Sequence, residues 1–314
     1  MTEAHGTGKY ERLLARCRQV PPISTAVAHP CDDASLSAAV EAARARIIQP
    51  ILCGPLDRIR RVARTLSLDI EPFEIVDAPH SHAAAARAVE LVRLGRAEVL
   101  MKGSLHTDEL MAEVVKRDTG LRSERRVSHV FIMDVPTYHK PLMVTDAAVN
   151  IFPTLDDKRD IVQNAVDLAR ALGIERPKVA ILSAVETVTG KIPSTVEAAA
   201  LCKMADRGQI TDAILDGPLA FDNAISAEAA RIKHIASPVA GDADILVVPD
   251  LEAGNMLAKN LTFMARADAA GIVLGARAPI ILTSRADNER TRMASCAVAA
   301  LYAHARRARP AVAA

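Results

Sequence analysis

A serine–arginine pair with an acidic residue close behind it stands where an apolar run gives way to a helical pattern. Residues 279–287 read Pro-Ile-Ile-Leu-Thr-Ser-Arg-Ala-Asp, and a long alanine-rich stretch follows. A strand that feeds a helix would place Ser284 at the helix N-cap, where backbone N–H groups favour an anion. Arg285 in the first turn opposes the helix dipole, which makes sense when a negatively charged ligand shares the site. A capping box between Ser284 and Asp287 explains the same residues without a ligand, so both interpretations stay open.

Other polar and glycine-containing loops follow apolar runs, where parallel α/β sheets place their ligand sites. Five residues in these loops are candidate binding residues: Lys102, Gly103, Asp216, Gly254 and Asn255. Lysine, an amide, glycine turns and helix N-termini suit the recognition of phosphate. Glycine and aspartate also make ordinary turns between strands and helices, which explains any one of these loops by itself. Because several such loops occur in one chain, we expect an anion site.

The chain alternates between short apolar runs and stretches of helical periodicity. The apolar runs lie at 24–28, 50–53, 73–76, 98–101, 127–133, 141–145, 178–182, 211–215, 244–248, 271–274 and 279–282. The helical patterns lie at 34–47, 56–66, 81–95, 107–117, 156–172, 193–207, 223–233, 253–267 and 288–307. This alternation predicts an α/β protein with a mostly parallel sheet and helices on both faces. It breaks at 127–145 and at 271–282, which are therefore the candidate domain crossings.

The composition is typical of a globular protein with a full core. Hydrophobic residues make up 50% of the 314 residues and charged residues 25%. The net charge of +1 gives no reason to expect nucleic acid or a membrane as partner. The five cysteines are an odd number without a C-x-x-C pair, which fits reduced thiols. Without a signal-peptide pattern or a membrane-spanning apolar run, the chain is expected to be cytoplasmic.

Signatures of several enzyme classes are missing from the sequence. No G-x-G-x-x-G follows a predicted strand, which argues against a Rossmann dinucleotide site. The lack of H-E-x-x-H and the scatter of the nine histidines argue against a catalytic zinc, and the lack of G-x-S-x-G against an α/β-hydrolase. No metal site is therefore expected, and His29 is interpreted as a surface or loop residue.

Seven strings, taken in order, resemble the phosphate acetyl/butyryltransferase family. They are Met-Lys-Gly at 101–103, Thr-Asp-Ala-Ala-Val-Asn at 145–150, Lys-Val-Ala-Ile-Leu-Ser at 178–183, Asp-Gly-Pro-Leu-Ala at 216–220, Val-Ala-Gly-Asp-Ala-Asp at 239–244, Pro-Asp-Leu-Glu-Ala-Gly-Asn at 249–255 and Thr-Ser-Arg-Ala-Asp at 283–287. The likeness covers nearly the whole chain and is weakest at its start. Details at 193–195 and 204–210 look more like the butyryl branch.

The resemblance implies two three-layer α/β/α domains with mostly parallel sheets and an interdomain cleft. This architecture is similar to that of isocitrate and isopropylmalate dehydrogenases. The resemblance also implies a homodimer and a C-terminal helix that returns to the first domain. With the two breaks in the alternation, it predicts a first domain of residues 1–138 and 287–314 and a second domain of residues 139–286.

The family's serine–arginine pair matches Ser284 and Arg285. The acetyl branch has a catalytic aspartate seven residues after that serine, where this chain has Thr291. Asp287 or Glu289 could replace it, and Asp287 is favoured because it is nearer the loop.

We therefore predict a phosphate acyltransferase that moves a short acyl group, acetyl or butyryl, reversibly between coenzyme A and inorganic phosphate. The CoA thiolate attacks the acyl phosphate directly in a ternary complex, with Asp287 as the base and Ser284 as the oxyanion donor. Arg285 and Lys102 clamp the phosphate. The remaining substrate contacts are assigned to Gly103, Gly254, Asn255 and Asp216. Coenzyme A is a substrate, and no tightly bound cofactor is expected.

Two other functions fit the same architecture. A metal- and NAD-dependent decarboxylating dehydrogenase needs clustered aspartate ligands and an adenine-binding loop, a set that this sequence does not assemble. A non-enzymatic binder of small anions is commonly exported, and no export signal is recognised here. The acyl-chain length is not encoded in a visible pattern, because one methylene is worth only about 1 kcal/mol and the pocket forms only in the fold.

Overall fold

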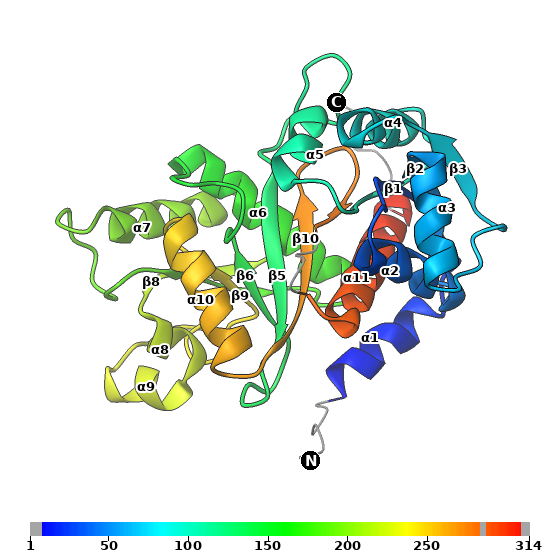
Figure 1. Cartoon of the computed structure of the whole chain (residues 1–314). Helices are drawn as coiled ribbons and strands as arrows, with labels where there is room; N and C mark the ends of the chain where they lie inside the picture. Colours follow the sequence, from blue (N-terminus) through cyan, green and yellow to red (C-terminus); the bar gives the residue numbers. More distant parts are fainter. Residues whose placement is uncertain (1–7, 283–286, 309–314) are drawn as a thin grey trace. The chain divides into compact units, whose positions relative to one another are not determined.

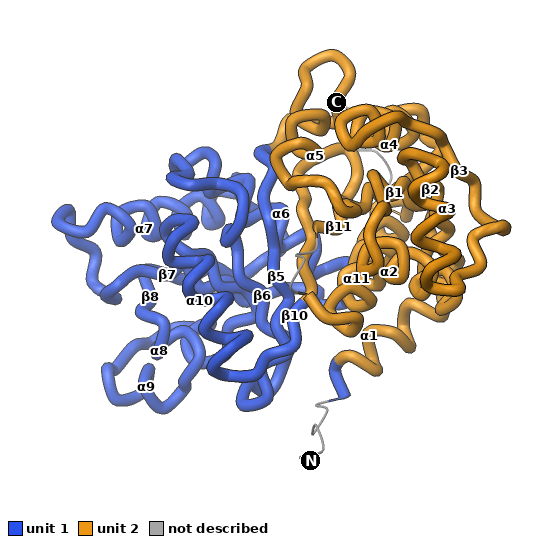
Figure 2. The backbone as a smooth tube through the Cα atoms, viewed as in Figure 1, with its two compact units in different colours: residues 1–9, 126–269 blue, residues 10–125, 270–314 orange. Residues whose placement is uncertain are grey.

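The computed structural model describes residues 8–282 and 287–308, and the chain divides into two compact units (Figure 2). Unit 1 comprises Met1–Lys9 with Arg126–Ala269, and unit 2 comprises Tyr10–Arg125 with Ala270–Ala314. Strands alternate with helices in both units (Figure 1). Among the described helices, none combines the length and the apolar character needed to span a bilayer.

The strands of unit 2 lie in the order β3-β2-β1-β4-β11-β10. They are β1 (Ile23–Ala28), β2 (Ile48–Gly54), β3 (Glu74–Asp77), β4 (Val99–Lys102), β11 (Ile280–Ile281) and β10 (Asp268–Leu274), the last belonging to unit 2 from Ala270 onward. Neighbouring strands are parallel except β10 and β11, which are antiparallel. All of β4 and nearly all of β1 is buried, as expected for parallel strands covered on both faces.

Helices cover both faces of the strands in unit 2. They are α1 (Lys9–Cys17), α2 (Asp33–Arg44), α3 (Leu56–Thr65), α4 (Ser81–Arg93), α5 (Thr107–Val114) and α11 (Glu289–Ala308). Helix α2 packs against α3 and α11, whereas α4 packs against α5. The crossovers through α2 and α4 run in opposite directions along the sheet, so right-handed connections place the two groups on opposite faces.

Unit 1 repeats this plan with the strand order β5-β6-β9-β7-β8. Its strands are β5 (Ser128–Asp134), β6 (Leu142–Thr145), β9 (Ile245–Val247), β7 (Lys178–Leu182) and β8 (Ile214–Leu219). Only β5 and β6 are antiparallel among the neighbours paired here. Its helices are α6 (Leu155–Ala171), α7 (Pro193–Asp206), α8 (Phe221–Ile225), α9 (Ala227–Ile232) and α10 (Leu251–Phe263). A hydrophobic core joins the strands to α8 and α10, while α6 and α7 pack on each other.

The predicted mixed α/β fold with a mostly parallel sheet is confirmed, with two local corrections. The run 211–215 was predicted as a strand with Asp216 in the loop after it, but β8 spans Ile214–Leu219 and contains Asp216. The helical pattern at 223–233 is two short helices, because Ser226 ends α8 and caps α9 through the backbone N–H of Ala229.

The boundaries between the compact units lie earlier in the chain than the boundaries between the predicted domains. The predicted domains were 1–138 with 287–314, and 139–286, whereas the units change at 125/126 and 269/270. The reason at the first crossing is that Val130–Met133 of β5 pair with Leu142–Thr145 of β6, so the hairpin lies entirely in unit 1. The assignment of residues to domains stays a prediction.

Asp242 and Asp244 connect the amino ends of the strands of unit 1. The Asp244 carboxylate accepts the Lys178 backbone N–H at 2.8 Å, and Lys178 Nζ reaches Asp242 at 2.7 Å. Lys140 Nζ pairs with both carboxylates, at 2.9 and 2.8 Å. Partial burial raises the pKa of Asp242, but hydrogen bonds from Lys178, Lys140 and His139 outweigh that effect and hold the pKa well below its usual range.

We predict that Asp242→Asn lowers the free energy of unfolding by about 0.5–1 kcal/mol at neutral pH, after allowance for solvent screening of this partly exposed carboxylate. A lowered folded-state pKa gives stability that is present above the unfolded pKa of about 4 and is lost as the pH falls below it. The difference between wild type and variant should therefore be constant from pH 7 to about pH 5 and shrink in more acid solution. Urea unfolding at several pH values measures it, with Asp118→Asn at an exposed turn as control. A difference that does not change with pH would contradict the assigned ion pairs.

Candidate active site

The carboxyl ends of β1, β4 and β11 meet at one edge of unit 2. Ala28 pairs with Lys102 in the parallel register of β1 and β4. Ile281 pairs with Met101 in the parallel register of β11 and β4. The chain that leaves β11 therefore starts beside Lys102, at the edge where α/β sheets bind ligands.

Lys102 is a buried cation at the last position of β4. Only 7% of the residue is exposed, and Nζ donates to the backbone carbonyls of Gly103 and Leu105, both at 3.2 Å. A lysine is almost never buried to this degree unless acceptors surround its ammonium group. Its position agrees with the prediction of a cation at this strand end, and its role as a phosphate clamp stays a prediction.

Gly103 allows the loop after β4 to touch the end of β1. A Cβ atom at this position would lie 2.4 Å from the Ala28 carbonyl oxygen and 2.5 Å from the His29 carbonyl oxygen. These are backbone atoms that cannot move aside without displacing the strand. The Gly103 N–H donates to the Ala28 carbonyl at 2.8 Å, and the Ser104 N–H donates to the His29 carbonyl at 2.9 Å. The backbone contacts therefore explain why glycine stands at position 103, whether or not it touches a substrate.

His29 and Ser104 belong to this corner, although the sequence interpretation took His29 for a surface or loop residue and gave it no place in the site. His29 is 7% exposed and has a left-handed backbone with φ 55°. Ser104 Oγ donates to the His29 carbonyl at 2.8 Å and lies 2.9 Å from His29 Nδ1. Because the single hydroxyl hydrogen is used on the carbonyl, Nδ1–H donates to Oγ and the imidazole lone pair is on Nε2. The only sequence signal for this pair is that each follows a predicted strand.

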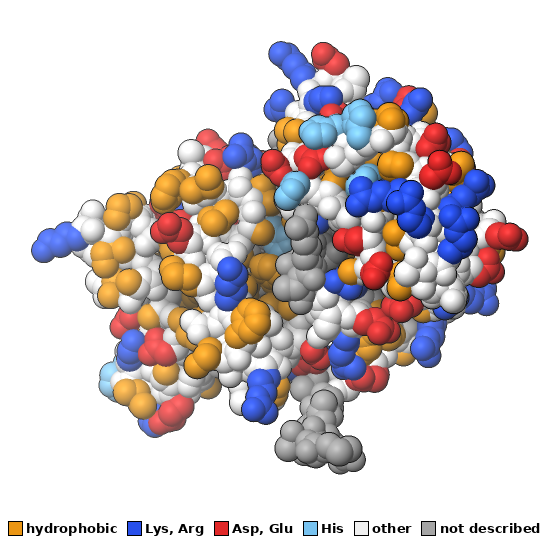
Figure 3. Space-filling model, in the orientation of Figure 1, with side chains coloured by type: hydrophobic (Ala, Val, Ile, Leu, Met, Phe, Trp, Pro, Cys, Tyr) orange, Lys and Arg blue, Asp and Glu red, His pale blue; other side chains and the backbone are white. Residues whose placement is uncertain are grey.

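Electrostatics at this corner favour a neutral imidazole and neutral thiols. Desolvation first and the Arg58 charge second lower the pKa of His29, against the opposing effects of Glu109 and Asp32. Burial raises the pKa of the Cys31 thiol to about 11. Arg58 lies on α3, over which Lys and Arg side chains gather in Figure 3. The Arg58 charge acts on His29 and adds positive potential at this corner, which suits an anionic substrate.

The predicted serine–arginine pair, Ser284 and Arg285, lies outside the described residues. Asp287 is described and half-buried, and α11 begins two residues later at Glu289. The Thr291 N–H donates to Asn288 Oδ1 at 2.8 Å, which makes Asn288 the N-cap of α11. The expectation that Ser284 caps this helix was therefore wrong. Asn288 was the better candidate, because asparagine ranks among the preferred N-cap residues and stands directly before the helical run.

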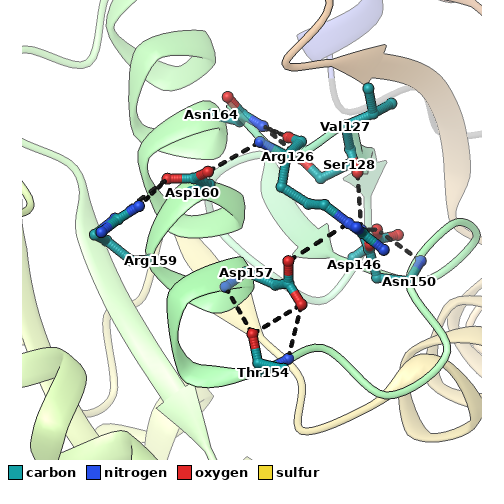
Figure 4. Close-up of polar contacts among 10 residues, drawn as sticks. All are labelled: Arg126, Val127, Ser128, Asp146, Asn150, Thr154, Asp157, Arg159, Asp160 and Asn164. Atoms are coloured by element: carbon teal, nitrogen blue, oxygen red, sulfur yellow. Dashed lines mark hydrogen bonds and ion pairs between the residues drawn. The ribbon is translucent and has the colours of Figure 1, made fainter. Parts of the chain in front are cut away.

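Asp146 follows β6 in unit 1 and organises the loop after it (Figure 4). Oδ1 accepts the backbone N–H groups of Ala148 and Val149 at 2.9 and 3.1 Å. Oδ2 accepts the backbone N–H and the side-chain Nδ2 of Asn150 at 3.1 and 2.6 Å. With these donors the carboxylate is well satisfied, so Asp146 shapes the loop and is a poor candidate for a base.

Arg126 connects the same loop to α6 (Figure 4). Its Nε donates to Asn150 Oδ1 at 2.7 Å and lies 3.6 Å from Asp157. Asp157 also forms a capping box with Thr154 at the start of α6. The loop after β6 is therefore held on both sides, although the sequence interpretation assigned none of these residues to the site.

Gly254 and Asn255 pack against the Asp146 loop, as residues of the first turns of α10. A Cβ atom at Gly254 would lie 2.9 Å from the Asp146 carbonyl oxygen and 3.0 Å from Ala147 Cα. Asn255 Nδ2 donates to the Ala147 carbonyl at 3.3 Å. These two predicted residues thus lie together at the carboxyl end of β6 and β9. Asp216 is not brought to them by any contact found in the described residues; its Oδ1 accepts the N–H of Gly217 at 2.9 Å.

No group of three or more His, Cys, Asp or Glu side chains with metal-binding geometry occurs in residues 8–282 and 287–308. The strand ends of unit 2 offer an ammonium group, a neutral imidazole and a hydroxyl group, held by a hydrogen-bonded loop. Such groups can neutralise and orient an anion and stabilise a developing oxyanion.

The chain is similar in sequence to known proteins along most of its length. A family model described as phosphate acetyl/butaryl transferase matches residues 81–300. The chain belongs to this family. The phosphate acetyltransferase of Rhizobium meliloti is 69% identical over 300 residues, which are 96% of this chain and 95% of that protein. The phosphate butyryltransferase of Clostridium acetobutylicum is 43% identical over 291 residues, 93% of this chain and 96% of that protein. The predicted family and enzyme class, an acyltransferase, are confirmed.

Solved structures agree with the fold. A branched-chain phosphotransacylase from Enterococcus faecalis has a TM-score of 0.79 and 33% identity, with 90% of this chain and 99% of that chain covered. A 4-hydroxythreonine-4-phosphate dehydrogenase from Klebsiella pneumoniae has a TM-score of 0.55 at 12% identity, with 90% of this chain and 99% of that chain covered. The second likeness concerns the fold alone and agrees with the predicted similarity to dehydrogenases.

We predict that Gly103→Ala destabilises unit 2 by at least about 2 kcal/mol, because the new methyl group has backbone atoms in its way. Thermal or urea unfolding measures the effect. Gly190→Ala is the matched control, since a Cβ atom there meets nothing within 4 Å. Equal stability of the two variants would show that the loop after β4 is not held against β1 as described.

Proposed function

We propose that this chain moves a short acyl group reversibly between coenzyme A and inorganic phosphate. Its family and the names of its relatives, phosphate acetyltransferase and phosphate butyryltransferase, support this reaction. The structural observation that carries the proposal is the parallel pairing of β4 with β11, because the chain leaves β11 beside Lys102 and reaches Ser284 and Arg285 soon afterwards.

The phosphate is proposed to bind between Lys102 and Arg285. Lysine offers a compact charge, and arginine offers a planar fork that matches two phosphate oxygens. Phosphate is the leaving group when CoA attacks an acyl phosphate, and two cations let it depart without a proton. Ser284 is proposed to donate to the oxyanion that forms on the carbonyl oxygen. Gly103 supports Lys102 through the loop geometry, while the substrate roles of Gly254, Asn255 and Asp216 stay predictions.

Asp287 is proposed to accept the proton of the CoA thiol. A thiol with a pKa near 8.5 is mostly protonated at neutral pH, so a nearby carboxylate assists as sulfur attacks. Asp287 is half-buried in the short segment before α11, whereas Glu289 is exposed in the first turn of that helix. Glu289 also raises the pKa of Glu41 on α2, second to the effect of burial, so its charge acts on that helix. This difference favours Asp287.

The acyl group is proposed to pass directly from phosphate to sulfur, without an acyl-enzyme. A thiolate nucleophile would need a lowered pKa, whereas the pKa of the Cys31 thiol at this corner is raised. Burial raises the pKa of Cys31 to about 11, and the other cysteines are also free thiols. Holding both substrates side by side supplies the rate through proximity. CoA and acyl-CoA, phosphate and acyl phosphate are the proposed partners, and a homodimer is the proposed assembly.

Purified protein should release CoA from acyl-CoA only when phosphate is present, as followed with a thiol reagent. Acetyl-, propionyl- and butyryl-CoA compared in one assay should differ in kcat/KM by about fivefold per methylene where the chain fits the pocket. Absence of phosphate-dependent release with all three would exclude the proposed reaction. Hydride transfer to NAD in the presence of magnesium, measured in parallel, tests the dehydrogenase alternative.

Arg285→Ala should raise the KM for phosphate by roughly 10- to 100-fold, because hydrogen bonds to a charged group are lost. The KM for acyl-CoA should change little, and the far-ultraviolet circular dichroism should stay that of the wild type. Unchanged phosphate kinetics in a folded variant would remove Arg285 from the site.

Asp287→Asn should lower kcat by roughly 10²–10⁴-fold, the range expected when a general base is lost. Glu289→Gln is the matched control, two residues away and at the start of the same helix, and it should keep nearly full activity. The reverse order of damage would assign the base to Glu289.

A further inference from the structure

Unit 2 contains a cavity of about 350 Å³ at the end of β4 opposite to Lys102. The cavity lies among the end of α4, the residues just before β4 and β11, and the last turns of α11. Its buried wall is aliphatic: Val92, Ala97, Leu121, Ala278, Pro279 and Ala303. Its exposed lining is cationic: Arg93, Arg277, Arg306 and Arg307. One carboxylate, that of Glu98, also lines it.

The charges around this cavity are not balanced. One arginine is paired, because Arg307 donates from Nε and Nη2 to the two oxygens of the Glu98 carboxylate. Among the described residues, the hydrogen bonds that Arg306 and Arg277 donate go to backbone carbonyls, from Arg306 Nη1 to Arg277 at 2.9 Å and from Arg277 Nε to Arg122 at 3.1 Å. Arg93 forms no ion pair or hydrogen bond with its side chain in the described part of the chain. The cavity therefore has several guanidinium groups with donors to spare and one acidic side chain.

An anion with an apolar body matches both parts of the lining. Guanidinium groups bind a carboxylate through two parallel hydrogen bonds. An aliphatic chain that covers the apolar wall removes apolar surface from water, which favours binding. The lining has no aromatic ring on which a nucleobase could stack, which argues against a nucleotide. We infer that this cavity binds an aliphatic carboxylate, with its head among the arginines and its chain against the wall. Glu98 occupies Arg307 and so competes with the ligand head.

This site is separate from the proposed acyl-transfer site, so its test does not use activity. Isothermal titration calorimetry at low ionic strength measures the binding of hexanoate to the full chain. Hexan-1-ol, which keeps the aliphatic chain and lacks the carboxylate, should bind at least about tenfold more weakly than hexanoate. Binding of hexan-1-ol as strong as that of hexanoate, or no binding of hexanoate, overturns the inference.

Three variants locate the binding. Arg93→Gln should weaken hexanoate binding by about five- to tenfold, and Glu98→Gln should strengthen it by a similar factor because Arg307 is released. Arg64→Gln is the matched control, since both Arg64 and Arg93 are exposed arginines in the last turn of a helix of unit 2. Binding that is the same in the Arg93 and Glu98 variants as in wild type places the ligand elsewhere and contradicts the inference.

Discussion

The close approach of Gly103 to the end of β1 is the constraint on which the proposed site depends. Two N–H groups of the loop after β4 donate to the carbonyls of Ala28, the last residue of β1, and of His29 directly after it, and a side chain at Gly103 would collide with those same carbonyls. This contact turns the loop so that Lys102 stays buried with its ammonium group on the carbonyls of Gly103 and Leu105. The buried cation and the imidazole of His29 are thus held in place before any substrate arrives, which is the kind of preorganisation that electrostatic catalysis requires.

In unit 1, the loop after β6 is also held by backbone hydrogen bonds and by a close contact at a glycine. The Asp146 carboxylate collects N–H groups of its own loop, and Gly254 lets α10 approach that loop closely. Both units therefore use a glycine at a backbone contact and a polar side chain directly after a strand. A reaction that relies on positioning two anionic substrates needs rigid loops more than it needs reactive side chains. The raised pKa of Cys31 agrees with this view, because it leaves the corner without a thiolate.

Much of the fold was predictable because buried parallel strands are short apolar runs, and the helical periods between them are clear. The strand β8 was misplaced because its polar Asp216 and Gly217 look like a turn although they lie within the strand. His29 was missed because its burial follows from the contact of two loops distant in sequence, which no local pattern reveals. Ser284 was taken for the cap of α11 in place of Asn288, because the end of the apolar run was assumed to be the start of the helix.

The most direct test of the central claim is the phosphate dependence of a Lys102→Met variant. Methionine keeps the unbranched apolar stem of the side chain and removes the charged end. If Lys102 is the cationic end of a phosphate site, the KM for phosphate in acyl-CoA cleavage should rise by roughly tenfold or more, with the KM for acyl-CoA within about twofold of wild type. A folded variant that uses phosphate as well as the wild type does would contradict the account.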